Sequence, residues 1–140
     1  MGARHTVLVA LLAVSGCTAT APDDPAHPVQ AVGWAETRLS FGLGPADDKT
    51  KGVSEQRWRA FLDREVTPRF PSGLSVIDMY GQWRDPGAAA PERLRSRLLV
   101  IDHPDDADDA ARLNAIRDAW KRMTGDRSVL SVTQTARVSF

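Results

Sequence analysis

Polar side chains that could carry out acid–base or binding chemistry concentrate in residues 78–84, which read Asp-Met-Tyr-Gly-Gln-Trp-Arg. In a strand, alternate side chains point to the same face of the sheet. The four functional side chains at alternate positions are Asp78, Tyr80, Gln82 and Arg84. Asp78 and Tyr80 are candidate catalytic residues, because both side chains can exchange a proton with a substrate. Gln82 and Arg84 are candidate ligand-binding residues, since an amide orients a carbonyl and a guanidinium holds an anion.

A second stretch supplies partners for this group. Residues 35–41 alternate between apolar and polar, with Glu36, Arg38 and Ser40 on the polar side. If both stretches lie in one sheet, their polar side chains could line a pocket, and Arg38 becomes a third candidate for ligand binding. The alternative is purely structural, because ladders of polar side chains across neighbouring strands are common in sheets that bind nothing.

Other kinds of catalytic or metal site find little support. Residues 102–106 contain one histidine and three carboxylates. Carboxylates at this point are already explained by the start of a helix, where they complement the helix dipole. A metal site needs three or four donors in suitable geometry, so we predict no metal site. The chain has one cysteine and no G-x-S-x-G motif, and it lacks a glycine-rich phosphate loop, so we predict no cofactor either.

The first sixteen residues are typical of a bacterial lipoprotein signal peptide. One arginine precedes the uncharged run TVLVALLAV at 6–14, which is too short to span a bilayer. Small residues then lead to Cys17, as in the lipobox, where cleavage falls just before the cysteine. We therefore expect Cys17 to carry lipid and to hold the protein on the extracytoplasmic side of a bacterial membrane. The alternative is an ordinary signal peptide in which the cysteine has no role.

A tether and a single domain are expected after the signal. Residues 17–33 include three closely spaced prolines and no apolar period, which predicts an extended linker. Residues 34–140 are long enough for one hydrophobic core. The whole chain has 18 basic and 18 acidic side chains, which argues against a nucleic-acid partner because such proteins normally carry a basic excess.

Within that domain, hydrophobic periodicity and turn residues predict six elements. Strands are expected at 35–41, 74–84, 96–102 and 128–133, with 136–140 continuing or re-entering the last one, and helices at 54–66 and 106–124. Ser54 is a good N-cap for the first helix, and Gly125 a good C-cap for the second. The order strand-helix-strand-strand-helix-strand predicts a ferredoxin-like α+β fold, with two helices on one face of a four-stranded antiparallel sheet.

This fold leaves one face of the sheet without helices. Residues 74–84 carry apolar side chains on both faces, and the run at 98–101 is almost continuously apolar. An uncovered apolar face is a liability in a monomer, so a second copy, another envelope protein, the C-terminal tail or a ligand should cover it. We expect a homodimer first, because self-association needs no further component.

Several segments resemble a bacterial family, the domain-of-unknown-function family 3574. The matching segments are residues 39–43, Trp58 with Phe61 and Leu62, residues 66–74, residues 80–84, residues 128–130 and residues 138–140. The family often has a cysteine shortly before its terminal VSF, where this chain has Arg137. The resemblance implies a secreted or lipid-anchored protein, and it implies no particular activity.

Two hypotheses of different class follow from the residues. The first is a lipid-anchored envelope module that dimerises, or binds a partner or small ligand, without turnover. The second is a small enzyme of the dimeric α/β-barrel kind, in which Asp78 or Tyr80 transfers a proton while Gln82, Arg84 or Arg38 orients the substrate. A closed pocket that brings Asp78, Tyr80 and Arg38 together would favour the enzyme, and a solid core with these side chains paired would contradict it.

Overall fold

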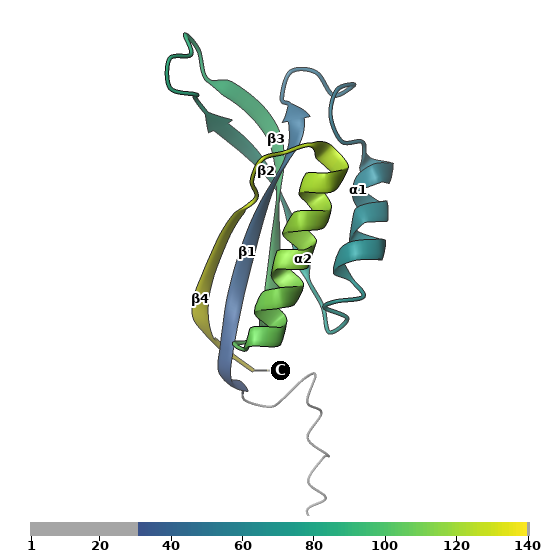
Figure 1. The fold of residues 1–140 in the computed structure, drawn as a ribbon, viewed down its shortest axis with the longest axis vertical. Coiled ribbons are helices and arrows are strands. Elements are labelled where there is room, and N and C mark those ends of the chain that lie inside the picture. The colour runs from purple at the N-terminus through teal and green to yellow at the C-terminus, as the bar shows by residue number, and fades with distance from the viewer. Residues whose placement is uncertain (1–30, 140) are drawn as a thin grey trace, which may run out of the picture.

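Four antiparallel strands form one sheet in the computed structural model, which describes residues 31–139 (Figure 1). The strands are β1 (Ala31–Pro45), β2 (Ser75–Trp83), β3 (Glu92–Pro104) and β4 (Leu130–Val138), in the order β2-β3-β1-β4. The helical elements are α1 (Glu55–Phe61), the π-helical segment η1 that continues it (Leu62–Val66), and α2 (Ala107–Thr124). Both helices lie on the same side of the sheet (Figure 1). This arrangement confirms the predicted ferredoxin-like fold.

Local capping signals set the ends of both helices. The hydroxyl of Ser54 accepts a hydrogen bond from the Arg57 backbone N–H at 3.2 Å, and the carboxylate of Asp106 accepts one from the Asp109 N–H at 2.7 Å. Gly125 ends α2 in the left-handed conformation, with φ of +85°. The predicted caps Ser54 and Gly125 are therefore confirmed.

Strand β1 is longer than its alternating pattern indicates, because it pairs along both edges with β3 and β4. It begins at Ala31, so the last three residues of the predicted 17–33 tether are part of the sheet. The register shifts between Gly42 and Gly44, where the strand bulges on its way to Pro45. The predicted signal peptide and Cys17 lie outside the described residues.

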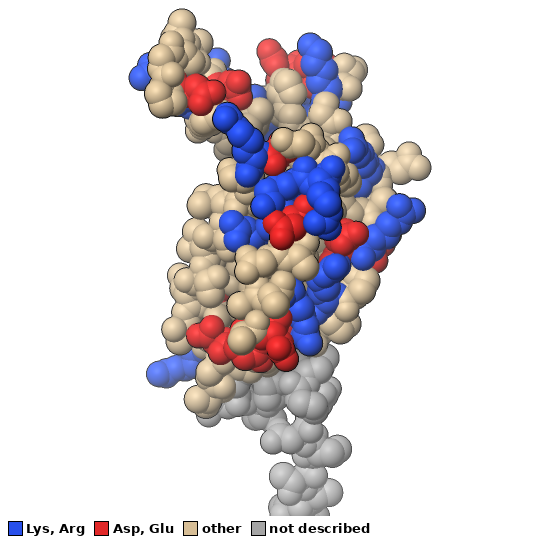
Figure 2. All heavy atoms as spheres, viewed as in Figure 1, with Lys and Arg blue, Asp and Glu red and all other residues tan. Residues whose placement is uncertain are grey.

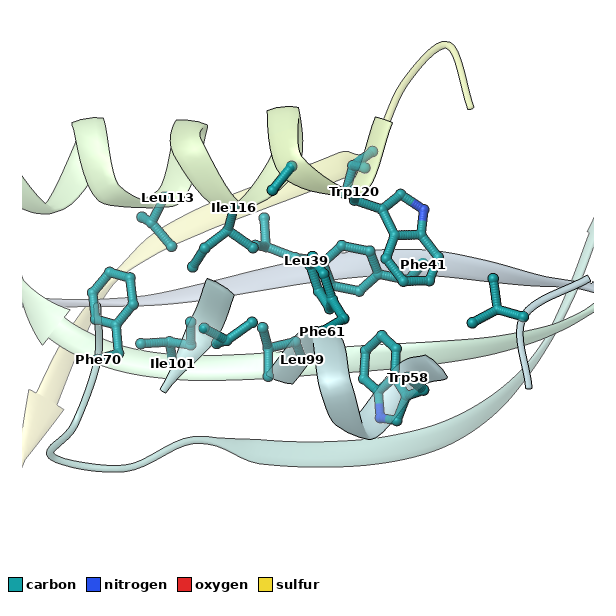
Figure 3. Packing of buried hydrophobic residues seen from close by; sticks show 14 of the residues in the cluster. Leu39, Phe41, Trp58, Phe61, Phe70, Leu99, Ile101, Leu113, Ile116 and Trp120 are labelled. Atoms are coloured by element: carbon teal, nitrogen blue, oxygen red, sulfur yellow. The ribbon is translucent and has the colours of Figure 1, made fainter. Parts of the chain in front are cut away.

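An aromatic cluster fills the space between the sheet and the helices. Phe41 from β1, Trp58 and Phe61 from α1, and Trp120 from α2 lie with ring centroids 4.8 to 5.8 Å apart (Figure 3). All of these pairs are edge-to-face or tilted rather than stacked face to face, and aromatic rings disfavour the face-to-face sandwich. All four side chains are almost fully buried, so this cluster is the centre of the core.

The two faces of the sheet differ in the way that the alternation predicts. Leu39, Leu99 and Ile101 point toward the helices and are completely buried. The opposite surface of the sheet, here called the open face, has no helix over it (Figure 1). Its apolar side chains include Ile77, Met79, Trp83, Leu98, Val100, Leu130 and Val132, and its central polar side chains are Glu36, Arg38 and Ser40. The prediction of an uncovered apolar face is therefore confirmed.

Charged side chains of both signs are intermixed over the helix layer, without a stripe of one sign (Figure 2). The hairpin that joins β2 to β3 projects past the ends of the helices (Figure 1). Within residues 31–139, no helix combines the length and the apolar character that crossing a membrane requires.

Candidate functional site

The polar side chains of β2 lie on the helix side of the sheet, and two of them are paired. The Asp78 carboxylate accepts a hydrogen bond from Arg97 Nε at 2.8 Å, and Gln82 Oε1 accepts a long one from Arg93 Nε at 3.4 Å. Tyr80 is 62% exposed on the projecting part of the hairpin. Arg84 is exposed just beyond the end of β2. These four candidates therefore follow the hairpin surface and enclose no pocket.

Arg97 accounts for the position of Asp78. Its guanidinium also donates to Glu55 Oε2 at 2.7 Å and lies 5.3 Å from the ring centroid of Trp58. Hydrogen bonds from Arg97 and Arg59 lower the pKa of Glu55 below its usual range. The pKa of Arg97 is raised although burial opposes this, because Asp78 and Glu55 both accept from it. This arrangement joins β2, β3 and the start of α1, which is a structural role for Asp78.

Arg38 lies on the other side of the sheet from Asp78 and Tyr80. Its Nε donates to Glu36 Oε1 at 2.6 Å, and the same oxygen accepts from Gln134 Nε2 at 3.3 Å. Glu36, Arg38 and Ser40 thus share the open face, whereas the β2 candidates share the helix side. The predicted pocket that combines both groups is wrong, because the register places them on opposite faces of one sheet. The pairing of Asp78 and Gln82 further removes the geometry that the enzyme hypothesis requires.

A buried polar cluster at the end of the sheet was not predicted. Thr37 Oγ1 lies 2.8 Å from His103 Nε2 and 2.8 Å from Thr133 Oγ1, and His103 Nδ1 lies 2.6 Å from the Pro104 carbonyl oxygen. A carbonyl can only accept, so Nδ1 carries a proton and donates to it, while Nε2 shares a hydrogen bond with the Thr37 hydroxyl. Thr37 and His103 are both buried, and the Asp109 carboxylate lies 3.9 Å from Nδ1.

The missed cluster has the components of a nucleophile, a base and a carboxylate, but Thr37 is fully buried and so is out of reach of a substrate. Its chemistry is therefore structural, since it gives each buried polar atom a partner. One sequence signal could have found it. Thr37 stands among apolar residues on the inward side of the 35–41 alternation, and an inward threonine needs a partner.

Metal-binding geometry is not found in the described part of the chain. No group of three or more His, Cys, Asp or Glu side chains among residues 31–139 is arranged to hold an ion. The Asp102–Asp106 region instead supplies the N-cap of α2, through Asp106. Asp109 is held by Arg112 at 2.6 Å.

The feature that the structure does assemble is the open face. Leu130 is 64%, Ile77 50% and Val132 47% exposed, although all three are large and apolar. Together with half-buried Leu98 and Val100 they form two apolar patches, one on β2 and β3 and one on β4. Polar side chains of β1 separate the two patches. Such a surface can bind another surface, and it carries no group placed for catalysis.

The element order and the helix layer on one side of the sheet define a ferredoxin-like α+β domain. The model of a family described as Protein of unknown function (DUF3574) matches residues 36–140. The chain belongs to this family, which confirms the resemblance seen in the sequence. No curated protein sequence matches the chain significantly.

Solved structures share the fold at low sequence identity. A phage SAM lyase in complex with S-methyl-5'-thioadenosine aligns with a TM-score of 0.58 and 13% identity, covering 79% of this chain and 92% of that chain. CutA from Synechococcus elongatus PCC7942 aligns with a TM-score of 0.51 and 11% identity, covering 79% of this chain and 85% of that chain. At these identities the likeness concerns the fold alone.

Proposed function

We propose that this protein is a lipid-anchored module of the bacterial cell envelope that associates with a second copy of itself through the open face. The observation that carries the proposal is the exposure of Ile77, Leu130 and Val132 on a sheet face that no helix covers. Contiguous apolar surface of this kind marks association sites in soluble domains. A binding module without turnover also agrees with the separation of the candidate catalytic residues.

The open face is self-complementary in the sense that a two-fold dimer requires. Its apolar patches lie on either side of β1, one on β2 and β3 and the other on β4. A two-fold axis that runs along β1, between two facing sheets, would place the β2–β3 patch of one copy against the β4 patch of the other. The central charges Glu36 and Arg38 already pair at 2.6 Å, so covering them leaves no unpaired charge.

The area of the face approaches that of a standard interface. Four strands about 4.8 Å apart and about nine residues long, at about 3.3 Å per residue, cover roughly 550 Å² in projection. Side-chain relief raises the accessible area toward the roughly 800 Å² that each partner buries in a standard interface. A second copy is therefore an occupant of the right size.

The anchor part of the proposal rests on the sequence before the domain. The uncharged run at 6–14 and the small residues before Cys17 are those that lipid attachment needs. One acyl chain holds a protein marginally and several hold it durably. With equal numbers of basic and acidic side chains, the protein has little electrostatic attraction to anionic headgroups, so lipid would supply the membrane affinity.

The oligomeric state of the full chain carrying Cys17→Ala, which can be studied without detergent, tests self-association. Sedimentation velocity should show a dimer at micromolar concentration. Val132→Arg and Ile77→Arg should each shift it to a monomer, because a charge would be buried in the interface. Tyr80→Arg is the matched control, since Tyr80 is as exposed as these residues but points to the helix side. A wild-type monomer at 100 µM, or dimers of all three variants, would contradict the proposal.

Membrane fractionation tests the anchor separately. Wild-type protein should sediment with membranes and incorporate labelled palmitate, and Cys17→Ala should move it to the soluble fraction without label. Cys17→Ser is a second variant that keeps the size of the side chain and should behave in the same way. Retention of either variant in the membrane fraction would show that lipid on Cys17 is not the anchor.

A further inference from the structure

We infer that the groove between the two helices is a binding site for a small amphipathic carboxylate. The groove lies between α1–η1 and α2 and has a volume of about 330 Å³. Its floor is apolar and consists of Ala60, Phe61, Ala119 and Met123, and its rim carries Arg57 and Arg64. This site is on the helix layer, so the inference is independent of the self-association proposed for the open face.

The size of the groove limits the class of ligand. The groove has a volume of about 330 Å³ and is open to solvent. This volume is at the lower end of the range for small-molecule sites, which are mostly apolar with a few polar groups that fix orientation. A carboxylate with a short alkyl or aryl body, such as octanoate, suits a groove of this size.

The rim of the groove has unused cationic donors. Among residues 31–139, the side chain of Arg64 has no ion-pair or hydrogen-bond partner. Arg57 donates one N–H to the Met123 carbonyl oxygen at 2.5 Å, which leaves most of its five donors free. Glu65 is the one acidic residue that lines the groove, and Arg69 already holds its carboxylate at 3.1 Å. The groove therefore offers an anion two guanidinium groups without an unneutralised acid beside them.

The backbone beside the groove is unusual in the same place. The Thr67 N–H donates to the Leu62 carbonyl oxygen at 2.9 Å, which closes a π-helical turn over η1. π-Helical turns within helices occur frequently at functional sites. Segment η1 supplies Arg64 to the rim, so the irregular turn and the free guanidinium belong to one feature.

Titration of the full chain carrying Cys17→Ala with sodium octanoate, followed by amide NMR shifts, tests the inference. Saturable shifts should centre on Ala60, Phe61 and Ala119, and octan-1-ol should bind several-fold more weakly because it lacks the charge. Arg64→Gln should weaken octanoate binding by roughly fivefold, as expected for a partly exposed ion pair. Ala60→Leu, a substitution that a helix tolerates, should fill the groove and abolish binding of both compounds.

Arg59→Gln is the matched control, because Arg59 also lies on α1 but pairs with Glu55 at 2.8 Å and does not line the groove. Its octanoate affinity should equal that of the wild type. The inference is overturned if 10 mM octanoate causes no localised shifts in the wild type. It is equally overturned if Arg64→Gln and Arg59→Gln bind octanoate alike, since the free guanidinium would then have no part in recognition.

Discussion

The helix-covered face and the open face of the sheet are made by alternate residues of the same strands, yet they have different roles. Leu99 and Leu98 are neighbours on β3, and Leu99 is completely buried under the helices while Leu98 is half-buried on the open face. On β1 the difference is chemical as well. Inward residues Leu39 and Phe41 are apolar, and outward residues Arg38 and Ser40 are polar.

This difference teaches which side chains hold the domain together and which remain available for binding. The covered face is completed by α1 and α2, whose aromatic side chains meet those of β1 (Figure 3). The open face keeps its apolar side chains although nothing within the described chain covers them. A protein that needed only to fold would have placed polar residues there, as many one-sided antiparallel sheets do.

Replacing each of the two neighbouring leucines of β3 by alanine is the most direct test of whether the two faces contribute differently to stability. Leu99→Ala should lower the free energy of unfolding by about 2–5 kcal/mol, through lost burial and a cavity. Leu98→Ala should lower it by less than about 1 kcal/mol, because that side chain is only half-buried and neighbouring groups can move in. Urea unfolding in a Val132→Arg background, which removes self-association, measures both. Equal losses would mean that the two faces contribute alike to the fold.

The buried cluster around His103 tests whether polar contacts on the covered face also stabilise the fold, because it places polar atoms among the buried apolar side chains. Thr37→Val keeps the shape but removes the hydroxyl that bonds His103 Nε2, leaving a buried ring nitrogen without its partner. We expect a loss of about 1–3 kcal/mol in urea unfolding. Thr133→Val is the control and should cost less, because Thr133 is exposed and His103 keeps its bond to Thr37. If both variants are equally stable, the cluster contributes nothing specific.

The order of elements and the bare face could be predicted because both depend on local patterns. The period of residues 35–41 identified a half-buried strand, and Ser54 and Gly125 identified helix ends through their own side chain and backbone conformation. The lengths of β1 and β3 could not be predicted, since residues at their ends are extended only by pairing with other strands. The π-helical turn at η1 has no signal of its own in the sequence.

The candidate site could be predicted only in part, because alternation groups residues within one strand and does not relate two strands. Asp78, Tyr80 and Gln82 do share a face, but the register of β2 against β3 and of β3 against β1 decides that Arg38 lies on the other one. The pairing of Asp78 with Arg97 depends on the same register. Thr37, His103 and Thr133 come together for a similar reason, across three strands, and so were missed.

Arg97 lies at the edge of the covered face, between the buried core and the charged surface, and its contacts should contribute modestly to stability. Arg97→Met keeps the length of the side chain but removes its bonds to Asp78 and Glu55 and its contact with Trp58. We expect a loss of about 1 kcal/mol, since exposed ion pairs contribute little and the cation–π contact adds a modest amount. Arg93→Met is the control on the same strand, because Arg93 makes one long bond to Gln82, and urea unfolding should show no change.

The smallest expected effect on stability comes from the ionisation of Glu55, which pairs with Arg97 at the exposed edge of the covered face. Hydrogen bonds from Arg97 and then Arg59 lower its pKa below the ordinary value of 4.5. A carboxylate with a lowered pKa stabilises the folded state above its unfolded pKa, and this stabilisation is lost as the pH falls through the folded value. Wild type should therefore melt slightly above Glu55→Gln at pH 7, and the two melting temperatures should converge as the pH falls below 4.5 and through the lowered pKa of Glu55. Because Glu55 is exposed, 0.5 M NaCl should remove most of the difference at pH 7. A difference in melting temperature that persists in 0.5 M NaCl would contradict this, because it would mean that the ion pairs of Glu55 are shielded from solvent like the buried contacts of the covered face.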